Sequence, residues 1–241
     1  MIDIHTHILP NLDDGASSPT ESLEMIERME RDGITHVVAT PHCTRTAPLY
    51  RDEIIARVGE LNTLLVSLQS KVTVLAGSEI SFFDADDFQA HYEHGDFCHL
   101  GDKPLYSLIE FPWHSEDVPA NAMETIDWMI ARGTTPIIAH PERTPYLREN
   151  PRLLQELTSR GAILQLTVDS VCGMTSAQSK TMSDMILRAF EPVVLASDSH
   201  SLARCSGLSI GHERVEQKFG KARADLLRSY NNAILQNILN A

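Results

Sequence analysis

The sequence is poor in cysteine and has no closely spaced pair of cysteines. None of its four cysteines lies in a C-x-x-C spacing, which argues against a zinc ribbon and against a redox-active pair. A structural zinc site of the all-cysteine type is therefore not predicted. We interpret these residues as ordinary buried or surface thiols. They are Cys43, Cys98, Cys172 and Cys205.

Positive charge and long apolar runs are also scarce. The chain has 20 Lys and Arg against 33 Asp and Glu, a net charge of −13, which disfavours a nucleic-acid partner or an anionic membrane surface. No apolar run is long enough to span a bilayer, and the first residues lack the pattern of a signal peptide. We therefore expect a cytoplasmic protein without membrane insertion. Its 241 residues suit a single domain, 1–241, because α/β barrels reach this length undivided.

Apolar segments alternate with amphipathic ones from the first residues onward. A capping box at Ser18 predicts the start of a helix, and Gly33 predicts its end. Gly133 and Gly161 repeat this helix end before an apolar segment. Such alternation without a hairpin signal indicates parallel βα units, and hence a barrel or a doubly wound sheet. Residues 82–102 have no clear pattern. The seven predicted strands are one that carries Ile2 and Ile4 and six at 34–40, 72–76, 105–109, 135–139, 163–168 and 192–197.

A residue able to bind a metal ion follows six of the seven predicted strands. In the first strand, His5 and His7 lie two positions apart, so their side chains point the same way. The carboxyl ends of parallel strands gather at one edge of a β/α fold, so we expect these side chains to meet there. Almost no lysine lies among them. The strand-end residues are His5, His7, His42, Glu79, Glu110, His140, Asp198 and His200.

These side chains indicate a metal site rich in oxygen and nitrogen. Histidine and carboxylate without cysteine suit zinc, manganese or iron, and argue against a structural zinc site. The candidates exceed what one ion needs, and two or three ions bridged by carboxylates would use them all. Clustered divalent ions are typical of enzymes that hydrolyse phosphate esters. The strand ends therefore predict a metal-dependent hydrolase.

Six short motifs resemble those of one known family. The block M-I-D-I-H-T-H-I-L-P-N-L-D-D-G-A opens the chain, and T-P-H (40–42), G-S-E-I (77–80), I-E-F-P (109–112), A-H-P-E-R (139–143) and S-D-S-H (197–200) follow. They are similar to the PHP (polymerase and histidinol phosphatase) family, and more narrowly to its capsule-biosynthesis branch of manganese-dependent tyrosine-protein phosphatases. The resemblance spans the chain and implies a distorted (β/α)7 barrel with a trinuclear metal site. Residues 167–170 match only loosely, so we assign them no role.

The matching positions imply three ion sites, two of which share Glu79 as a bridge. The resemblance implies two or three divalent ions, with manganese as the expected metal and iron or zinc as alternatives. We interpret Asp13 as a turn cap before Gly15 and Asp14 as a ligand. The first site would hold His5, His7, Glu79 and Asp198, the second Glu79, Glu110 and His140, and the third Asp14, His42 and His200.

Two arginines complete the predicted site. The resemblance implies that Arg143, in the A-H-P-E-R motif, and Arg204, just after S-D-S-H, face the substrate phosphate. A surface salt bridge from Arg143 to Glu142 or Glu149 is the structural alternative. Three further residues are considered only for the rim of the site or the floor of an aromatic pocket. They are Arg45, Tyr146 and Trp113.

The expected charge balance suits a phosphate monoester. Three divalent ions bring about +6 and the four carboxylates about −4, so the net charge of about +2 attracts a dianion. A hydroxide that bridges two ions, its pKa lowered to about 7, would attack phosphorus in line. Tyrosine is a fairly easy leaving group because its pKa is about 10, so we assign no general acid. The implied partner is a phosphotyrosine-containing protein, a bacterial tyrosine autokinase that controls capsular or extracellular polysaccharide synthesis.

Two other functions stay open from the sequence. A small-molecule phosphatase such as histidinol phosphatase would use the same chemistry, and a non-enzymatic metal-stabilised binding module would use the same ligands without turnover. A proofreading 3′-exonuclease, known among relatives, is disfavoured by the negative charge and the lack of a polymerase domain. A thiol phosphatase is excluded, because none of the cysteines begins a C-x5-R motif.

Overall fold

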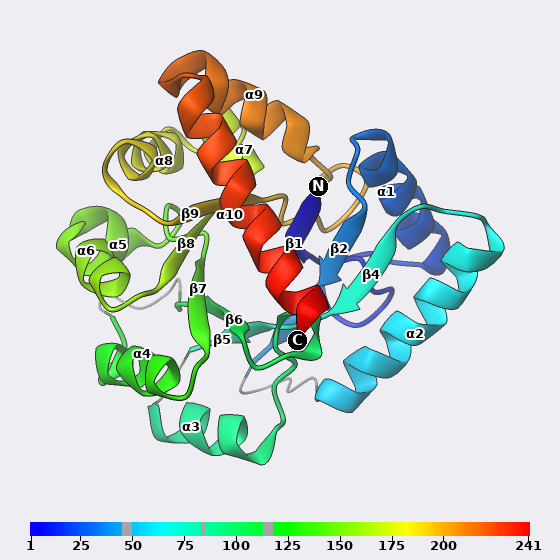
Figure 1. Cartoon of the computed structure of the whole chain (residues 1–241), viewed down its shortest axis with the longest axis horizontal. Helices are drawn as coiled ribbons and strands as arrows, with labels where there is room; N and C mark the ends of the chain where they lie inside the picture. The colour runs from blue at the N-terminus through cyan, green and yellow to red at the C-terminus, as the bar shows by residue number, and fades with distance from the viewer. Residues whose placement is uncertain (45–49, 83–84, 113–117) are drawn as a thin grey trace.

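Helices surround a set of parallel strands (Figure 1). The computed structural model describes residues 1–44, 50–82, 85–112 and 118–241. Arg45 and Trp113, considered above for the rim and floor of the site, lie outside these residues. Strands and helices alternate along the described chain, so the expected α/β class is confirmed. Among the described helices, none combines the length and the apolar character needed to cross a membrane.

The named strands of the described chain pair in parallel and form two sheets. They are β1 (Ile2–Thr6), β2 (His36–Ala39), β3 (His42–Cys43), β4 (Thr73–Ala76), β5 (Glu79–Ser81), β6 (Tyr106–Glu110), β7 (Thr135–Ala139), β8 (Ile163–Thr167) and β9 (Val193–Ala196). The smaller sheet has the order β1-β2-β4, and the larger one has the order β3-β5-β6-β7-β8-β9. Seven of these strands match the predicted ones, and β3 and β5 are additional.

Two runs of strand are each interrupted by two residues, and these interruptions separate the two sheets. Thr40 and Pro41 lie between β2 and β3, and Gly77 and Ser78 lie between β4 and β5. Pro41 has no backbone N–H to donate to a neighbouring strand. A Cβ atom at Gly77 would lie 2.7 Å from Cγ1 of Val38, so this close approach of the chains requires glycine. Each broken run therefore contributes one strand to each sheet.

The carboxyl end of the first strand contacts the residues that follow the last strand. The N–H of Asp198 donates to the carbonyl of His5 at 3.0 Å, and the N–H of His7 donates to the carbonyl of Ser199 at 2.8 Å. An isolated parallel bridge joins Thr6 to Ser199. The residues that follow β1 and β9 are therefore neighbours, although they come from opposite ends of the strand order.

The predicted amphipathic helices form the outer layer. They are α1 (Pro19–Arg31), α2 (Arg51–Ser67), α4 (Ala122–Ala131), α6 (Arg152–Ser159), α8 (Ala177–Ala189), α9 (Leu208–Phe219) and α10 (Lys221–Asn240). The start of α1 is as predicted, because Oγ of Ser18 accepts from the N–H of Glu21 at 3.2 Å. The Glu21 carboxylate in turn accepts from the N–H of Leu202 at 3.2 Å. This contact ties α1 to the loop that follows β9.

Several short elements depart from the sequence-based expectation. Residues 82–102, which had no clear pattern, contain α3 (Ala85–His94) and a 3-10 turn (Leu100–Asp102). The helices α5 (Pro145–Glu149) and α7 (Val168–Cys172) follow β7 and β8, and both are too short to show apolar periodicity. Thr167 begins α7 by accepting a hydrogen bond from the N–H of Ser170.

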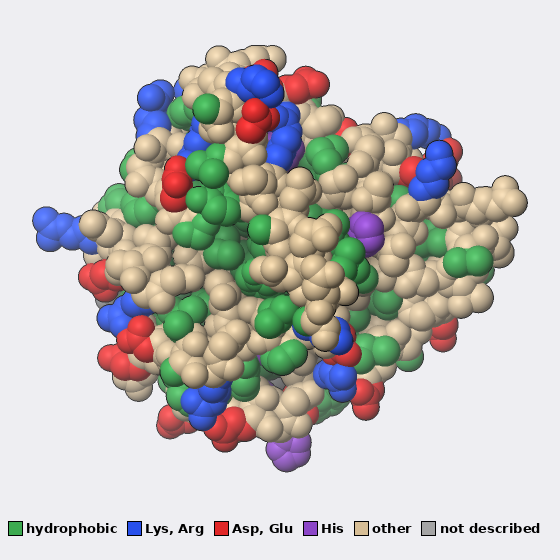
Figure 2. Space-filling view, viewed as in Figure 1, with side chains coloured by type: hydrophobic (Ala, Val, Ile, Leu, Met, Phe, Trp, Pro, Cys, Tyr) green, Lys and Arg blue, Asp and Glu red, His purple; other side chains and the backbone are tan. Residues whose placement is uncertain are grey.

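The last helix, α10, covers the amino ends of the strands. Ile234 and Ile238 are buried in one apolar cluster with Ile2, the first residue of β1. The Asn231 side chain accepts from the N–H of Leu195 at 3.2 Å and donates to its carbonyl at 2.8 Å. In Figure 1 this helix crosses in front of the strands, and Figure 2 shows that on this face the charged side chains gather mainly at the periphery. The metal-ligand candidates follow the other ends of the strands.

Candidate metal centre

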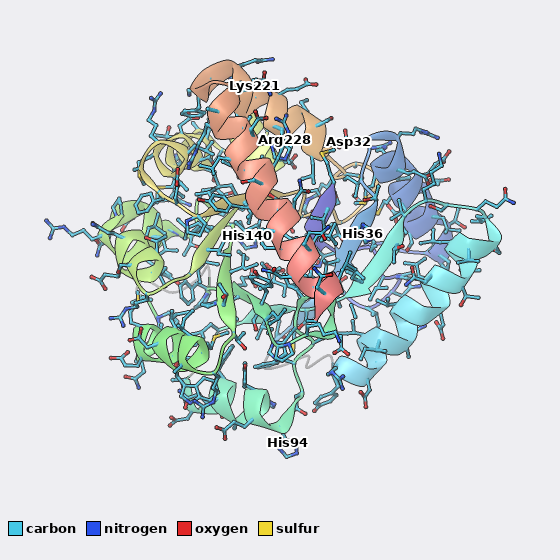
Figure 3. The ribbon with its side chains drawn as sticks, in the orientation of Figure 1. Asp32, His36, His94, His140, Lys221 and Arg228 are labelled. Carbon is cyan, nitrogen blue, oxygen red and sulfur yellow. The ribbon has the colours of Figure 1, made fainter. Side chains whose placement is uncertain are left out.

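The donor atoms of all nine predicted ligands converge in space. They form four overlapping groups, and within each group the donor atoms lie within 4.8 Å of one another. In Figure 3, His140 lies near the centre of the view, among the strands. Side chains that follow separate strands therefore share one site, as the strand-end pattern predicts. The groups are His7–Asp14–His42–His200, His5–Glu79–His140, His5–His7–Asp198 and His42–Glu79–Glu110.

Glu79 lies at the middle of these groups and is fully buried. Its Oε2 atom is 3.3 Å from Nε2 of His5 and 3.3 Å from Nε2 of His7. The same oxygen is 3.0 Å from Nδ1 of His42. The other oxygen, Oε1, is 2.8 Å from Nε2 of His140. One carboxylate therefore contacts four imidazoles, an arrangement compatible with a bridging ligand.

His5 and His7 face each other, as their spacing in the first strand predicts. Their Nε2 atoms are 3.2 Å apart and lie 3.3 and 3.5 Å from Oδ1 of Asp198. Two ring nitrogens at this separation beside a carboxylate suit a shared cation.

Asp198 and His140 have φ values of 55° and 29°, which are uncommon for residues other than glycine. Such strain is concentrated at functional sites.

Asp14, His42 and His200 form the outer part of the site. Oδ1 of Asp14 is 3.4 Å from Nε2 of His42 and 3.4 Å from Nε2 of His200. The Asp14 side chain is 65% exposed, whereas that of Glu79 is buried. The ring of His7 stacks on that of His200, with centroids 3.9 Å apart. His7 therefore lies between the first and third predicted groups, which the motifs did not indicate.

Two of these histidines are held by residues behind them. Nδ1 of His5 lies 2.9 Å from Oε1 of Gln165, and Nδ1 of His7 lies 2.7 Å from Oδ2 of Asp13. Each contact leaves Nε2 facing the site, as outer partners do for metal-binding histidines. The turn cap predicted for Asp13 is present, because Oδ1 accepts from the N–H of Gly15 at 2.9 Å. The contacts of Asp13 with His7 and of Gln165 with His5 were missed, since neither leaves a signal in local spacing.

The charges in the site are strongly coupled. Burial raises the pKa of Glu79, but His5 and the neighbouring imidazoles hold that pKa well below its usual value. Against burial, His5, His7 and Arg143 likewise keep the pKa of Asp198 well below its usual value. Burial lowers the pKa of His5, but Glu79 and Asp198 outweigh it and raise that pKa to about 9. The carboxylates therefore stay ionised and require positive charge close by.

The donor set fits divalent metal ions. Within the described residues, Oε2 of Glu79 and Nδ1 of His42 are buried atoms without a hydrogen bond, although they are 3.0 Å apart. Burying polar atoms in this way is unfavourable, and a cation that accepts a lone pair from each would satisfy both. Imidazole and carboxylate donors without thiolate suit manganese, iron or zinc. The geometry therefore agrees with the class of metal expected from the sequence.

Arg143 lies in the wall of the site and not on the surface. Its Nη1 donates to Oδ2 of Asp198 at 2.5 Å, and its Nη2 donates to Oγ1 of Thr167 at 3.1 Å. The side chain is only 11% exposed, so the alternative of a surface salt bridge to Glu142 or Glu149 is wrong. Glu142 is itself buried and accepts from the N–H and the hydroxyl of Thr167 at 3.0 and 2.9 Å. Thr167, which lies in the segment without an assigned role, therefore links Arg143 to a buried carboxylate.

Arg204 and Tyr146 differ in their exposure. The Arg204 side chain is exposed on the turn after His200, where its carbonyl accepts from the N–H of His200 at 3.2 Å. This turn places Arg204 beside the outer part of the site. Tyr146, expected at the rim, is only 4% exposed, because it lies in α5 and joins the apolar core. The expectation of a rim position for Tyr146 is therefore wrong.

The whole chain is similar to proteins of one family. The family model described as capsular polysaccharide synthesis, CpsB/CapC, matches residues 1–237. The tyrosine-protein phosphatase YwqE of Bacillus subtilis is 36% identical over 241 residues, which cover 98% of this chain and 92% of that protein. The putative tyrosine-protein phosphatase CapC of Staphylococcus aureus is 31% identical over 205 residues, which cover 84% of this chain and 78% of that protein.

Solved structures agree with this relationship. One solved structure comes from work on YwqE from Bacillus subtilis and CpsB from Streptococcus pneumoniae, which are described as unique metal-dependent tyrosine phosphatases. It has a TM-score of 0.91 and 32% identity to this chain, and the match covers 98% of this chain and 95% of that chain. Histidinol phosphate phosphatase from Lactococcus lactis has a TM-score of 0.57 and 12% identity, covers 92% and 94% of the two chains, and shows the fold alone. The resemblance predicted from the motifs is confirmed. The chain belongs to the CpsB/CapC family of capsular polysaccharide synthesis.

Proposed function

We propose that this chain is a metal-dependent protein-tyrosine phosphatase, a hydrolase of phosphoric monoesters. The observation that carries the proposal is the convergence of nine ligand-type side chains, which come from six different strands or from the loops that follow them. The relative YwqE is named as a tyrosine-protein phosphatase and CapC as a putative one, and the neighbour with a TM-score of 0.91 is described as metal-dependent. The chemistry of the site and the family relationship support the same activity.

The proposed architecture is a distorted (β/α)7 barrel of the PHP type. When β2 with β3, and β4 with β5, are each counted as one bent strand, the described strands follow one another through seven positions. The hydrogen bonds between the ends of β1 and β9 support closure of this ring. Active sites of β/α barrels lie at the carboxyl ends of the strands, which is where the ligand candidates gather.

Two or three divalent ions would be held by the groups that the motifs imply, with manganese as the proposed metal and iron or zinc as alternatives. When bound, ions of this kind supply Lewis acidity and lower the pKa of a coordinated water to about 7. Glu79 is suited to act as a ligand shared by two ions, because its two oxygens contact different imidazoles. The proposed groups are His5, His7, Glu79 and Asp198; Glu79, Glu110 and His140; and Asp14, His42 and His200.

Two arginines are proposed to bind and orient the phosphate. Arg143 presents a guanidinium in the wall of the site, and Arg204 is exposed beside the outer group, so charge-assisted hydrogen bonds to phosphate oxygens are available from both. Asp198 holds Nη1 of Arg143 in place before substrate arrives, which limits the reorganisation needed for catalysis. The phenol of tyrosine leaves with a pKa of about 10, so no residue is assigned as a general acid.

The proposed substrate is phosphotyrosine in a bacterial tyrosine autokinase that controls capsular or extracellular polysaccharide synthesis. The description of the matched family supports this process. The 65% exposure of the Asp14 side chain also suits a substrate that is itself a protein, because a residue carried on another chain must reach the site from outside. A cytoplasmic location is part of the same proposal.

Metal analysis of the purified protein, joined to a phosphatase assay, tests this function. The protein as purified, after chelation and after Mn2+ is added back should be compared on p-nitrophenyl phosphate, a phosphotyrosine peptide and histidinol phosphate. We expect activity to disappear on chelation, to return with Mn2+ and to favour the phosphotyrosine peptide. A preference for histidinol phosphate would select the small-molecule alternative. Metal-replete protein that hydrolyses none of the three, but melts earlier after chelation, would select the binding module.

A further inference from the structure

We infer that Asp13 is a positioning residue for the outer part of the metal centre, in addition to the turn cap that the sequence predicts. Its role there presupposes the proposed metal-dependent function. Asp13 is absent from the four groups of ligand candidates among the described residues. Its carboxylate instead organises the residues around it, because it contacts His7, anchors the backbone of His42 and fixes the loop that carries Asp14.

Three N–H donors converge on the two carboxylate oxygens of Asp13. Oδ2 accepts from Nδ1 of His7 at 2.7 Å and from the backbone N–H of His42 at 3.1 Å. Oδ1 accepts from the backbone N–H of Gly15 at 2.9 Å. The Asp13 side chain is only 6% exposed, so water has little access to replace these contacts. Both oxygens are therefore needed as acceptors.

The hydrogen bond from His7 to Asp13 determines which ring nitrogen of His7 carries the proton, and therefore which one can bind a metal ion. An imidazole that donates from Nδ1 keeps its lone pair on Nε2, and Nε2 of His7 lies 3.2 Å from Nε2 of His5 and 3.5 Å from Oδ1 of Asp198. If the acceptor behind Nδ1 were lost, the proton could move to Nε2 and block coordination. A carboxylate in this position also makes a metal-binding histidine more basic.

The turn at Gly15 brings the chain close to both Asp13 and His7. A Cβ atom at Gly15 would lie 2.1 Å from the carbonyl oxygen of His7 and 2.8 Å from Oδ1 of Asp13, so the close approach requires glycine. The loop folded in this way leaves Oδ1 of Asp14 3.4 Å from Nε2 of His42. Asp13 therefore acts on His7 through its ring and on two members of the outer part of the site, on His42 through its backbone and on Asp14 through the adjoining chain.

Asparagine cannot reproduce these contacts, although it caps turns as aspartate does. Its side chain has one acceptor oxygen and one amide that only donates. With the oxygen toward Gly15, the amide faces Nδ1 of His7 and the N–H of His42. With the oxygen toward His7, the amide faces the N–H of Gly15. Asp13→Asn therefore separates the two roles, because turn capping alone predicts little change and positioning predicts weaker metal binding.

The test titrates the full-length wild type and Asp13→Asn with Mn2+ and measures free Mn2+ by electron paramagnetic resonance. We expect the most weakly held Mn2+ to bind about 10–100-fold more weakly to Asp13→Asn, the usual effect of losing an outer hydrogen bond at a metal site. Asp32→Asn is the matched control, because the Asp32 carboxylate also accepts from a backbone N–H, that of Ser209 at 3.0 Å. Asp32 lies apart from His140 in Figure 3, so its variant should bind Mn2+ as the wild type does.

A second measurement does not depend on the folding of a variant. In the zinc-loaded wild type, long-range proton–nitrogen NMR spectra report which ring nitrogen of His7 carries the proton, and we expect Nδ1. A proton on Nε2, or unchanged Mn2+ binding by folded Asp13→Asn, would overturn the role of Asp13. The proposed function would survive either result if the wild type still hydrolysed a phosphotyrosine peptide with Mn2+. A wild type that bound neither Mn2+ nor iron or zinc would overturn both proposals.

Discussion

Nε2 of His140 lies 2.8 Å from Oε1 of Glu79, and both side chains are buried. This contact places His140 beside the carboxylate proposed to be shared by two ions. His140→Ala should lower kcat by at least about 100-fold, because loss of a ligand should exceed the 10–100-fold effect of losing an outer hydrogen bond. The fold should persist, since no apolar core side chain is removed. Steady-state kinetics at saturating Mn2+ and circular dichroism measure the two effects. Turnover at the wild-type rate would remove His140 from the mechanism.

Arg143→Ala should chiefly weaken the handling of phosphate. The guanidinium is already held by Asp198 and Thr167, and a hydrogen bond to a charged group contributes about 1.5–3 kcal/mol. That loss corresponds to roughly 10–100-fold in kcat/KM, and inorganic phosphate should inhibit the variant less. Arg160→Ala is the control, because Arg160 pairs with Asp127 at the surface. If kcat/KM were unchanged in Arg143→Ala, the residue would have a structural role only.

Removing metal should lower the melting temperature. Glu79 and Asp198 are buried carboxylates among imidazoles, so cations that bind only the folded chain stabilise it by mass action. Mn2+ at 100 times its Kd should add about 2.7 kcal/mol, or roughly 5–10 °C for a protein of this size. Thermal unfolding with a chelator and with Mn2+ added back measures the shift, which should be smaller in His140→Ala. Equal melting temperatures in both conditions would contradict the metal centre.

His212, in α9, should make the protein sensitive to acid. Burial and then the charge of Arg228 lower the pKa of His212 from 6.5 to about 4, although Asp32 opposes the shift. Figure 3 shows the positions of Arg228 and Asp32. Between pH 6.5 and pH 4 the unfolded chain binds a proton that the folded chain excludes. This contribution to stability is therefore fully present above pH 6.5 and is lost as the pH falls toward 4.

His212→Gln should reduce this acid sensitivity. Urea unfolding of the wild type and the variant at pH 7 and pH 5 measures it, and the loss of stability should be smaller in the variant by on the order of 1–2 kcal/mol. Burial also lowers the pKa of His99 to about 4, but that residue is common to both proteins, so the difference between them isolates His212. Parallel pH profiles would show that His212 does not titrate in this way.

The strands and the residues at their ends could be predicted because each leaves a local signal. An apolar run followed at once by His140 or Asp198 is visible in the sequence, and parallel pairing follows from the alternation with helices. The strands β3 and β5 could not be predicted, because two or three residues carry no periodicity. They follow the interruptions at Thr40–Pro41 and at Gly77–Ser78. Likewise, the first turn of α7 at Thr167 depends on a cap and not on an apolar pattern.

The residues behind the ligands could not be predicted from local sequence. Gln165 lies in the middle of β8, and its contact with His5 depends on the arrangement of distant strands. The position of Asp13 before Gly15 already predicts a turn cap, which is present, and nothing in the neighbouring sequence indicates its second contact, with His7. The burial of Tyr146 follows from a helix of five residues, too short to be detected. In each case tertiary packing gives the side chain a role that its neighbours in sequence do not specify.

The hydrogen bonds between the ends of β1 and β9 have a consequence for biosynthesis. The imidazoles of His5 and His7 are translated well before the carboxylate of Asp198, which lies 3.3 and 3.5 Å from them in the folded chain. A nascent chain therefore cannot assemble this group of side chains until β9 has been translated, and a product terminated before β9 lacks its carboxylate.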